Sequence, residues 1–337
     1  MFHIMKKFIQ SALQRKYLEK RAVFIIMLVL VLLPLKLKGV YFYHCMIFTF
    51  YFAVLGTSWN IISGYSGAVS LGHAAFLSIG AYTSTILLIN FQLTPWIGML
   101  IGGSLSALSG LVICYPATKL KGPYFVMSTA AFAEILRYLT SQSKFAGGAS
   151  GLIIPVVTGN SLYWFQFIEK WPFYYIILFF TIIVVFISYK IENSKVGLYL
   201  MAIRENRGAA QMLGVNVAKY LRMATCLSAF FTGIAGTFYA QYMVYISPDA
   251  IMGLGESIKI ALVAIIGGMG TFIGPIIGAA LYFGVGEIVR FLLGAEISGL
   301  SSFIYGIILI VFILLFPKGL VQFLKDMGGR FERYFIH

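Results

Sequence analysis

The chain has 337 residues, of which 60% are hydrophobic and 11% are charged, and its mean hydropathy is +0.91. A soluble domain carries about twice that charged fraction, and apolar stretches of about 20 residues, the length that crosses a bilayer, recur along this sequence. The composition excludes a soluble globular protein and predicts an all-α integral membrane protein. The net charge of +14 does not indicate nucleic-acid binding, because most Lys and Arg side chains flank apolar stretches, where they set topology and meet anionic lipid.

About ten transmembrane helices (8–10) are expected, with both termini in the cytoplasm. A basic segment, residues 1–21, precedes a permease-sized membrane domain, residues 22–316, and a basic tail, residues 317–337, follows it. Residues 140–170 form the longest predicted extracytoplasmic loop. The expected spans are Ala22–Leu35, Val40–Ile62, a third that ends at Ile89, Trp96–Thr118, Tyr124–Leu139, Trp171–Tyr189, Met223–Ile246, the half-length Ser257–Ile266, Ile276–Leu293 and Ser302–Phe316.

A polar island, residues 190–222, separates two long apolar runs and holds six cations against two glutamates. Lys and Arg in short loops favour the cytoplasmic side. Its middle, Arg204 to Gly214, is expected to form one short helix with Gly214 as its C-terminal stop. Such a helix between two spans is suited to dock into a groove on a soluble partner. The competing interpretation is a solvated positive loop without a docking role.

Two glycine-rich stretches interrupt the apolar pattern, at Gly64–Gly72 and at Gly267–Gly274. Glycine allows close backbone approach and departures from the helix, which transporters use in broken helices that line a central site. Membrane bundles also use glycine simply for helix packing. His73 follows the first break and is interpreted either as a donor to substrate or as a packing histidine that is satisfied by a neighbour.

Charged residues inside spans are costly and therefore invite a functional interpretation. Here each acidic residue has a cation three positions later, on the same helical face, which favours stabilising ion pairs over a proton relay. The histidines and cysteines are scattered, so no metal site and no membrane-enzyme site are expected. The structural pairs are Glu134 with Arg137, Glu256 with Lys259, and Glu287 with Arg290.

Several motifs, in order from about residue 56 to residue 320, resemble the permeases of branched-chain amino acid ABC importers of the LivM type. One departure is Lys259, which stands where this family has an acidic residue, three positions after Glu256. The matching stretches are Gly64–Phe76 with Gly80–Tyr82, Lys121–Phe125, Ala131–Ile135, Gly147–Leu152, Gly197–Gly214, Gly267–Thr271 with Gly274–Ala279, and Phe316–Leu320.

The resemblance implies a transport subunit of the bacterial plasma (inner) membrane that is not an enzyme and carries no cofactor, since ATP would be bound by partner subunits. The sequence contains no G-x-x-x-x-G-K-[ST] motif. The implied partners are a second related permease, two cytoplasmic ATPase subunits and an extracytoplasmic amino-acid binding protein. Import of urea or short amides, and transport driven by an ion gradient, are the alternatives.

The same resemblance assigns two sets of residues. The first set would couple the chain to an ATPase: Arg204, Glu205, Asn206, Arg207, Ala209, Ala210, Leu213 and Gly214. The second set would flank the substrate path: Gly64, Gly67, Ser70, Gly72, His73, Gly267, Gly268, Gly270 and Gly274.

Overall fold

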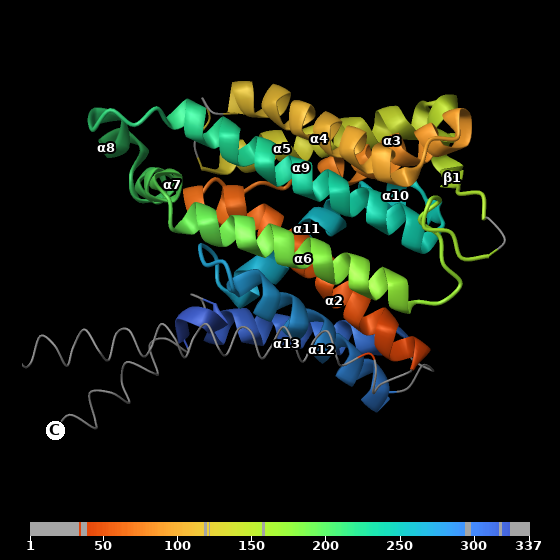
Figure 1. Cartoon of the computed structure of the whole chain (residues 1–337). Helices are drawn as coiled ribbons and strands as arrows, with labels where there is room; N and C mark the ends of the chain where they lie inside the picture. Colours follow the sequence, from red (N-terminus) through yellow and green to blue (C-terminus); the bar gives the residue numbers. More distant parts are fainter. Residues whose placement is uncertain are drawn as a thin grey trace, which may run out of the picture.

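The computed structural model describes residue 34 and residues 39–117, 120, 122–156, 159–293, 298–316 and 319–323, without the side chains of 117, 288–302 and 305. The predicted basic segment 1–21, the first predicted span apart from Pro34, and residues 324–337 of the predicted tail lie outside this part of the chain. Helices dominate the described residues (Figure 1). Their bounds are α2 Val40–Trp59, the π-helical turn η1 Asn60–Gly64, α3 His73–Phe91, α4 Pro95–Ala117, α5 Pro123–Gln142, α6 Trp171–Glu192, α7 Lys195–Glu205, α8 Arg207–Met212, α9 Val217–Met243, α10 Pro248–Ile251, α11 Leu254–Gly267, α12 Gly274–Leu293 and α13 Ser298–Leu315.

Six segments of the described chain are long and apolar enough to cross a membrane. This finding confirms an all-α protein with several membrane spans, whereas the ten crossings and the cytoplasmic termini stay predictions. The predicted fifth span, α5, is more polar along its length than its neighbours. The six segments are 40–64, 73–91, 95–116, 171–192, 217–243 and 248–267.

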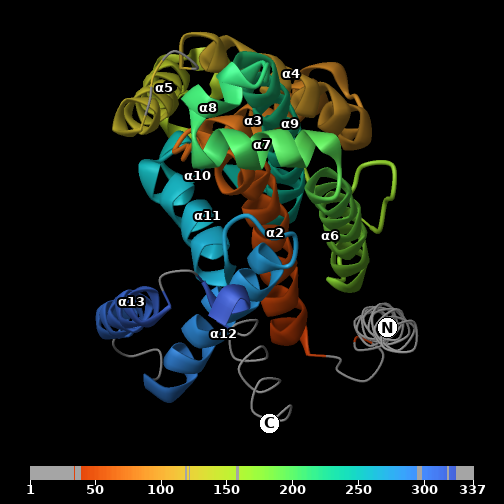
Figure 2. The ribbon, with the colours of Figure 1, turned by 90° about the vertical axis from the view of Figure 1, so that its left-hand side faces the viewer.

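The two ends of the helix bundle carry different structures. At one end, α7 lies across the ends of the helices and leads into α8 (Figures 1 and 2). At the other end, the segment between α5 and α6 forms two 3-10 turns, Lys144–Ala146 and Gly148–Ser150, and then the strand β1. β1, Leu152–Ile153, pairs antiparallel with β2, Tyr245–Ile246, which directly follows α9. The loop predicted at 140–170 is therefore fastened to the end of α9.

Helices α3, α4 and α9 pack closely because small residues meet where they cross. A Cβ at Gly80 would lie 2.0 Å from the carbonyl oxygen of Gly233, and one at Gly102 would lie 2.9 Å from the carbonyl oxygen of Gly80. Thr237 Oγ1 donates to that same Gly80 oxygen at 3.1 Å. Lipid tails are as apolar as leucine, so close van der Waals contact and interhelical hydrogen bonds hold such helices together.

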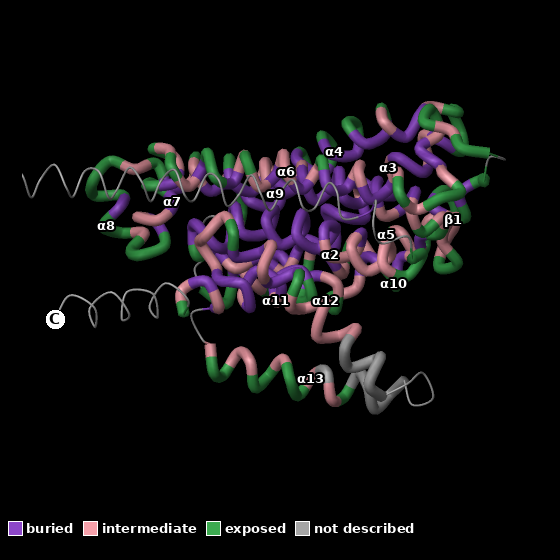
Figure 3. The backbone as a smooth tube through the Cα atoms, turned by 60° about the horizontal axis from the view of Figure 1, so that its bottom comes forward, coloured by how far each residue is buried: buried purple, intermediate pink, exposed green. Residues whose placement is uncertain are grey.

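A second group contains α2, α6, α11 and α12, with α2 at its centre. A Cβ at Gly278 of α12 would lie 1.8 Å from the carbonyl oxygen of Val263 of α11, so these helices form a tight hairpin. The rings of Phe50 and Tyr174 meet edge to face at 5.5 Å, joining α2 to α6. Figure 3 shows that the buried residues concentrate in α2 and in the helices around it, whereas α13 carries many exposed positions.

Residues 204–214 do not form the single short helix that the sequence predicted, because the break at Asn206 leaves Arg204 and Glu205 in a separate helix. α6 continues to Glu192, and two helices, α7 and α8, meet at Asn206. Asn206 has extended backbone angles, φ −156° and ψ 109°, and its Oδ1 accepts from the backbone nitrogens of Gly208 at 2.9 Å and Ala209 at 3.1 Å. Asparagine is among the best N-cap residues, because its side chain satisfies amides that a helix start leaves unpaired. The side chain therefore ends one helix and begins the next.

Candidate functional site

The two glycine breaks lie against each other at the α7 end of the bundle. α2 continues through the η1 turn to Gly64, and the chain then unwinds before α3 begins at His73. The second break, residues 268–273, joins α11 to α12. The buried Asn60 of η1 joins the two, because its Oδ1 accepts from Gly270 N at 2.8 Å and its Nδ2 donates to Thr271 O at 3.0 Å.

Glycine is required at this junction for space and for backbone conformation. A Cβ at Gly64 would lie 1.8 Å from Oδ1 of Asn60 and 2.8 Å from the backbone nitrogen of Gly270. Gly67, Gly268 and Gly270 have positive φ angles of 70°, 126° and 80°, a region that residues with a Cβ rarely adopt. The remaining predicted glycines also make close contacts: a Cβ at Gly267 would lie 1.8 Å from the Gly274 carbonyl oxygen.

Glu192, at the end of α6, holds the second break from another side. Its Oε2 accepts from the backbone nitrogen of Phe272 at 2.7 Å and from the hydroxyl of Tyr65 at 3.1 Å. Hydrogen bonds to an ionised carboxylate are stronger than those between neutral groups. One acidic side chain thus links both breaks to α6, although the sequence showed it only as a charge opposing the loop cations.

Arg204 is exposed at the end of α7, and its side chain reaches both breaks. From the last turn of α7, its Nη1 donates to the carbonyl oxygen of Gly64 at 2.9 Å. The same nitrogen is 2.6 Å from where a Cβ of Gly270 would be, and its Cγ is 2.9 Å from where a Cβ of Gly67 would be. From the end of α7, this predicted coupling residue therefore contacts both of the stretches that were predicted to flank the substrate path.

Two cavities flank Arg204. One of about 420 Å³ is lined by residues 66–69, 122, 125–126 and 203–208. The other, of about 500 Å³, is lined by residues 201, 204–205, 265, 268–271 and 322. Arg204 and Glu205 contribute to both walls, so the end of α7 separates the two spaces.

α8 presents an apolar face away from the bundle. Met212 and Leu213 are 91% and 82% exposed, and Ala209 is exposed one turn earlier on the same face. Ala210 points the other way and is only 2% exposed, so it packs inside the chain and does not belong to the predicted docking surface. Gly214 has a φ of 83° just after the helix, which confirms it as the C-terminal stop.

Arg207, the first residue of α8, fastens that helix to the rest of the chain. Its Nη1 donates to the carbonyl oxygen of Leu120 at 2.9 Å. Burial lowers the pKa of its guanidinium below the ordinary value, against a smaller opposing effect of the Cys114 thiol. Like Arg204, this predicted coupling residue is engaged by the chain itself.

His73 is completely buried at the start of α3. Its Nε2 lies 2.8 Å from Ser228 Oγ of α9, and that hydroxyl donates to the carbonyl oxygen of Ser58 at 2.6 Å. Ser228 is therefore the acceptor of the Nε2 proton. Ser228 lies near the middle of α9, and His73, which follows the first break, contacts it. The first break therefore extends from Gly64, at the α7 end, into the middle of the bundle. This network satisfies Nε2 and supports the packing interpretation of the histidine, whereas Nδ1 is buried without a hydrogen-bond partner among the described residues.

Ser70 and Gly72, also predicted to flank the path, help shape the chain between η1 and α3. Ser70 is buried, its carbonyl oxygen accepts from Trp59 Nε1 at 2.8 Å, and its Oγ accepts from Gly72 N at 3.3 Å. A Cβ at Gly72 would lie 3.1 Å from the carbonyl oxygen of Thr129 in α5. These contacts are internal to the protein.

The predicted ion pairs are present where their side chains are described. Arg137 Nε lies 2.9 Å from Glu134 Oε2, and Lys259 Nζ lies 2.5 Å from Glu256 Oε1. Arg137 also contacts Asp249 Oδ1 of α10 at 2.6 Å, a partner 112 positions away that no local spacing indicates. The side chain of Arg290 lies outside the described part.

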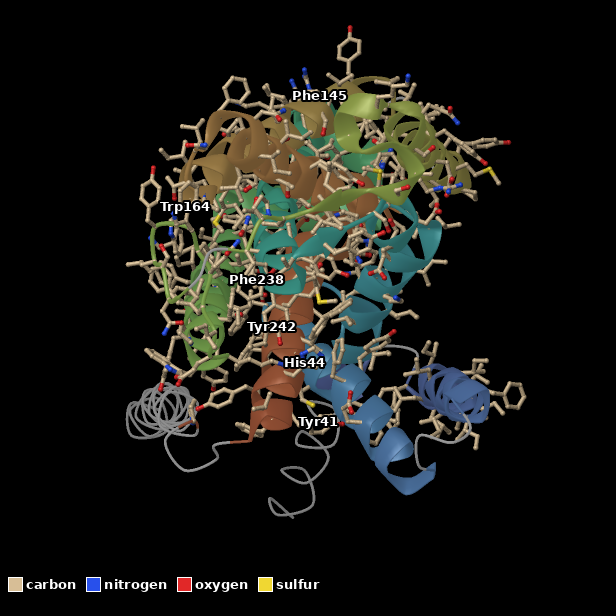
Figure 4. The ribbon with its side chains drawn as sticks, turned by 90° about the vertical axis from the view of Figure 1, so that its right-hand side faces the viewer. Tyr41, His44, Phe145, Trp164, Phe238 and Tyr242 are labelled. Atoms are coloured by element: carbon tan, nitrogen blue, oxygen red, sulfur yellow. The ribbon has the colours of Figure 1, made fainter. Side chains whose placement is uncertain are left out.

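The end of the bundle opposite α8 is rich in aromatic side chains (Figure 4). His44 Nδ1 lies 2.6 Å from the Tyr242 hydroxyl, and the rings of Phe238 and Tyr242 stack in parallel at 6.1 Å. Glu287 accepts a hydrogen bond from Tyr41 of α2. These contacts join α2, α9 and α12. Within the described residues, no group of three His, Cys, Asp or Glu side chains could hold a metal ion.

Comparison with known proteins shows that the chain is similar to permease subunits of transport systems. A family model described as "Branched-chain amino acid transport system / permease component" matches residues 41–313. The high-affinity branched-chain amino acid transport system permease proteins LivM of Salmonella typhimurium and Escherichia coli are each 27% identical over 69% of this chain and 60% of their own length. The nucleoside ABC transporter permease protein NupC of Lactococcus lactis is 27% identical over 66% of this chain and 74% of its own. No solved structure matches.

Proposed function

Because the chain belongs to the branched-chain amino acid transport system permease family, we propose that it is the membrane subunit of an ATP-driven importer of branched-chain, small apolar amino acids. The match over residues 41–313 carries this proposal, since it contains both glycine breaks and the α7–α8 segment. The chain is a multi-pass protein of the bacterial plasma (inner) membrane. It spans about 60% of the length of the LivM relatives it matches.

The proposed complex contains a second related permease, two cytoplasmic ATPase subunits and an extracytoplasmic binding protein. The exposed apolar face of α8, formed by Ala209, Met212 and Leu213, supports an ATPase partner. Apolar helix faces commonly bind in grooves of partner proteins. In this proposal α8 is the docking element, and the α7 end of the bundle is cytoplasmic.

Nucleosides are a second candidate substrate class. The NupC relative and the guanosine ABC transporter permease protein NupQ of Bacillus subtilis match over 74% and 73% of their own lengths, more than the LivM relatives do. An ion-gradient mechanism has less support, because an ion-coupled carrier needs a membrane carboxylate that is free to bind its ion. Glu134 and Glu256 instead lie within 2.9 Å of a cation, and Glu287 accepts from Tyr41.

The first test is purification of the chain from its native membrane in mild detergent, with identification of the proteins that accompany it. We expect a second permease and ATPase subunits. After reconstitution with the binding protein, uptake of leucine and of guanosine is compared directly. Reproducible recovery of the chain alone, with uptake driven by a proton or sodium gradient, would refute the ABC importer.

A second test addresses the docking face of α8. Ala209→Glu places a charge on the exposed apolar face, so we expect loss of uptake and of ATPase co-purification with the membrane fold intact. Gln211→Glu is the matched control, because Gln211 is exposed on the same helix but lies on another side. Equal uptake by both normally expressed variants would remove the docking role of α8.

A further inference from the structure

The break between α11 and α12 is held by side chains from three separate elements. Asn60 of η1 engages Gly270 N and Thr271 O, and Glu192 of α6 accepts from Phe272 N. Arg204 of α7 lies against Gly270 and donates to Gly64 O. Asn60 and Glu192 extend from helices of the bundle, whereas Arg204 comes from the helix that crosses the end of the bundle.

The position of Arg204 links this junction to α8. Arg204 is in the last turn of α7, and Asn206, two residues later, is both the C-cap of α7 and the N-cap of α8. Because no flexible linker separates the two helices, a displacement of α8 is passed on to the end of α7. Leu200 and Ile203, on the inner face of α7, are each 1% exposed, so α7 packs closely on the end of the bundle that it covers.

The absence of a side chain at two glycines, one in each break, leaves space for the Arg204 side chain. Gly67 and Gly270 have positive φ angles, and a Cβ at either position would come within 3 Å of an Arg204 atom. The side chain also borders the cavities of about 420 and 500 Å³. Its withdrawal would therefore remove its hydrogen bond to Gly64 O and its contact with Gly270, and would open these spaces toward each other.

We propose that Arg204 is a positioning residue that holds the two glycine breaks together at the α7 end and transmits the movement of α8 to them. The transport role of this latch rests on the proposed function. When an ATPase displaces α8, Arg204 leaves the Gly64 carbonyl, and the break between α11 and α12 is freed on the same side. In this proposal, the Arg204 guanidinium connects ATPase docking at α8 to the opening of the contact between the two breaks.

The test measures the accessibility of the second break in the full-length chain. A Met269→Cys variant places a thiol in the wall of the larger cavity, and its reaction rate with a membrane-impermeant maleimide is recorded. Labelling of the three native cysteines, measured without this substitution, is subtracted. Adding Arg204→Ala removes a charged hydrogen bond, so we expect labelling about tenfold faster or more. Arg204→Lys keeps a donor and a charge and is expected to restore much of the slow rate.

Lys219→Ala is the matched control, because Lys219 is an exposed cation of the same polar segment at the start of α9. In the assembled transporter we expect Arg204→Ala to retain ATP hydrolysis while uptake falls about tenfold or more, and Lys219→Ala to change neither. Arg204→Ala labelling and uptake equal to those of Lys219→Ala would overturn the latch. The labelling assay needs no partner protein. Failure to find an ATPase would therefore refute the proposed function, whereas the labelling rates would still test whether Arg204 holds the two breaks together.

Discussion

Replacing Gly64 with alanine adds one carbon at the point where the two breaks meet. The new Cβ would lie 1.8 Å from Asn60 Oδ1 and 2.8 Å from Gly270 N, closer than non-bonded atoms approach. The Asn60 amide must therefore turn away and lose its hydrogen bonds of 2.8 and 3.0 Å. Gly255→Ala is the matched control, because no atom lies within 4 Å of a Cβ at that helical position.

The expected cost follows from those two hydrogen bonds. Each is worth about 0.6–1 kcal/mol net in a membrane protein, and leaving the Gly270 N–H and Thr271 carbonyl unpaired costs about 1–3 kcal/mol more. The better helix propensity of alanine returns up to about 1 kcal/mol. We therefore expect Gly64→Ala to lower the free energy of unfolding by about 1–5 kcal/mol.

The assay is thermal unfolding of the full chain in mild detergent, followed by reaction of a thiol-sensitive dye with Cys114, which is 1% exposed in the folded chain. The Gly64→Ala variant should unfold at a clearly lower temperature than the parent, and Gly255→Ala at the same or a slightly higher one. Identical midpoints for all three proteins would refute the contact between Asn60, Gly64 and Gly270.

Two further predictions concern buried and capping hydrogen bonds. Ser228→Ala removes the acceptor of His73 Nε2 inside the bundle and should destabilise the fold by about 1–3 kcal/mol. The control, Ser104→Ala, changes an exposed hydroxyl of α4 and should leave the stability unchanged. Equal unfolding midpoints for the two variants in the same thermal assay would contradict the buried pair. Asn206→Ala removes the N-cap of α8 and should lower the local stability of that helix by about 1 kcal/mol. Amide hydrogen exchange should then be faster in residues 207–212 but unchanged in α9. Asn206→Asp keeps the cap, so its exchange should equal that of the parent.

Much of the architecture is determined by local sequence patterns. Apolar runs predicted several of the membrane spans, because the length of a span must match the hydrocarbon thickness. Glycine runs predicted both breaks, since positive φ at Gly67, Gly268 and Gly270 is available to few other residues. Gly214 was confirmed as the helix stop for the same reason. The i, i+3 spacing predicted the pairs of Glu134 with Arg137 and Glu256 with Lys259, because neighbours on a helix face need no tertiary information.

The hydrogen-bond partners of Asn60 could not be predicted from local sequence patterns. A lone amide within an apolar span is itself a signal, because a polar group in a membrane interior must find a partner. The partner, Gly270, is 210 positions away, and only the meeting of η1 with the second break identified it. The N-cap preference of Asn206 could likewise have predicted two helices in place of one.

Arg204, Ala210 and Asp249 were decided by tertiary structure alone. The family resemblance assigned Arg204 and Ala210 to the coupling residues, but only the packing of α7 and α8 showed that Arg204 donates to Gly64 O and that Ala210 is buried. The approach of α10 to α5 gave Arg137 its second partner, Asp249. Hydropathy determines which segments enter the membrane, whereas the partner of each polar group depends on which helices pack together, and that choice is made by contacts between residues far apart in the sequence.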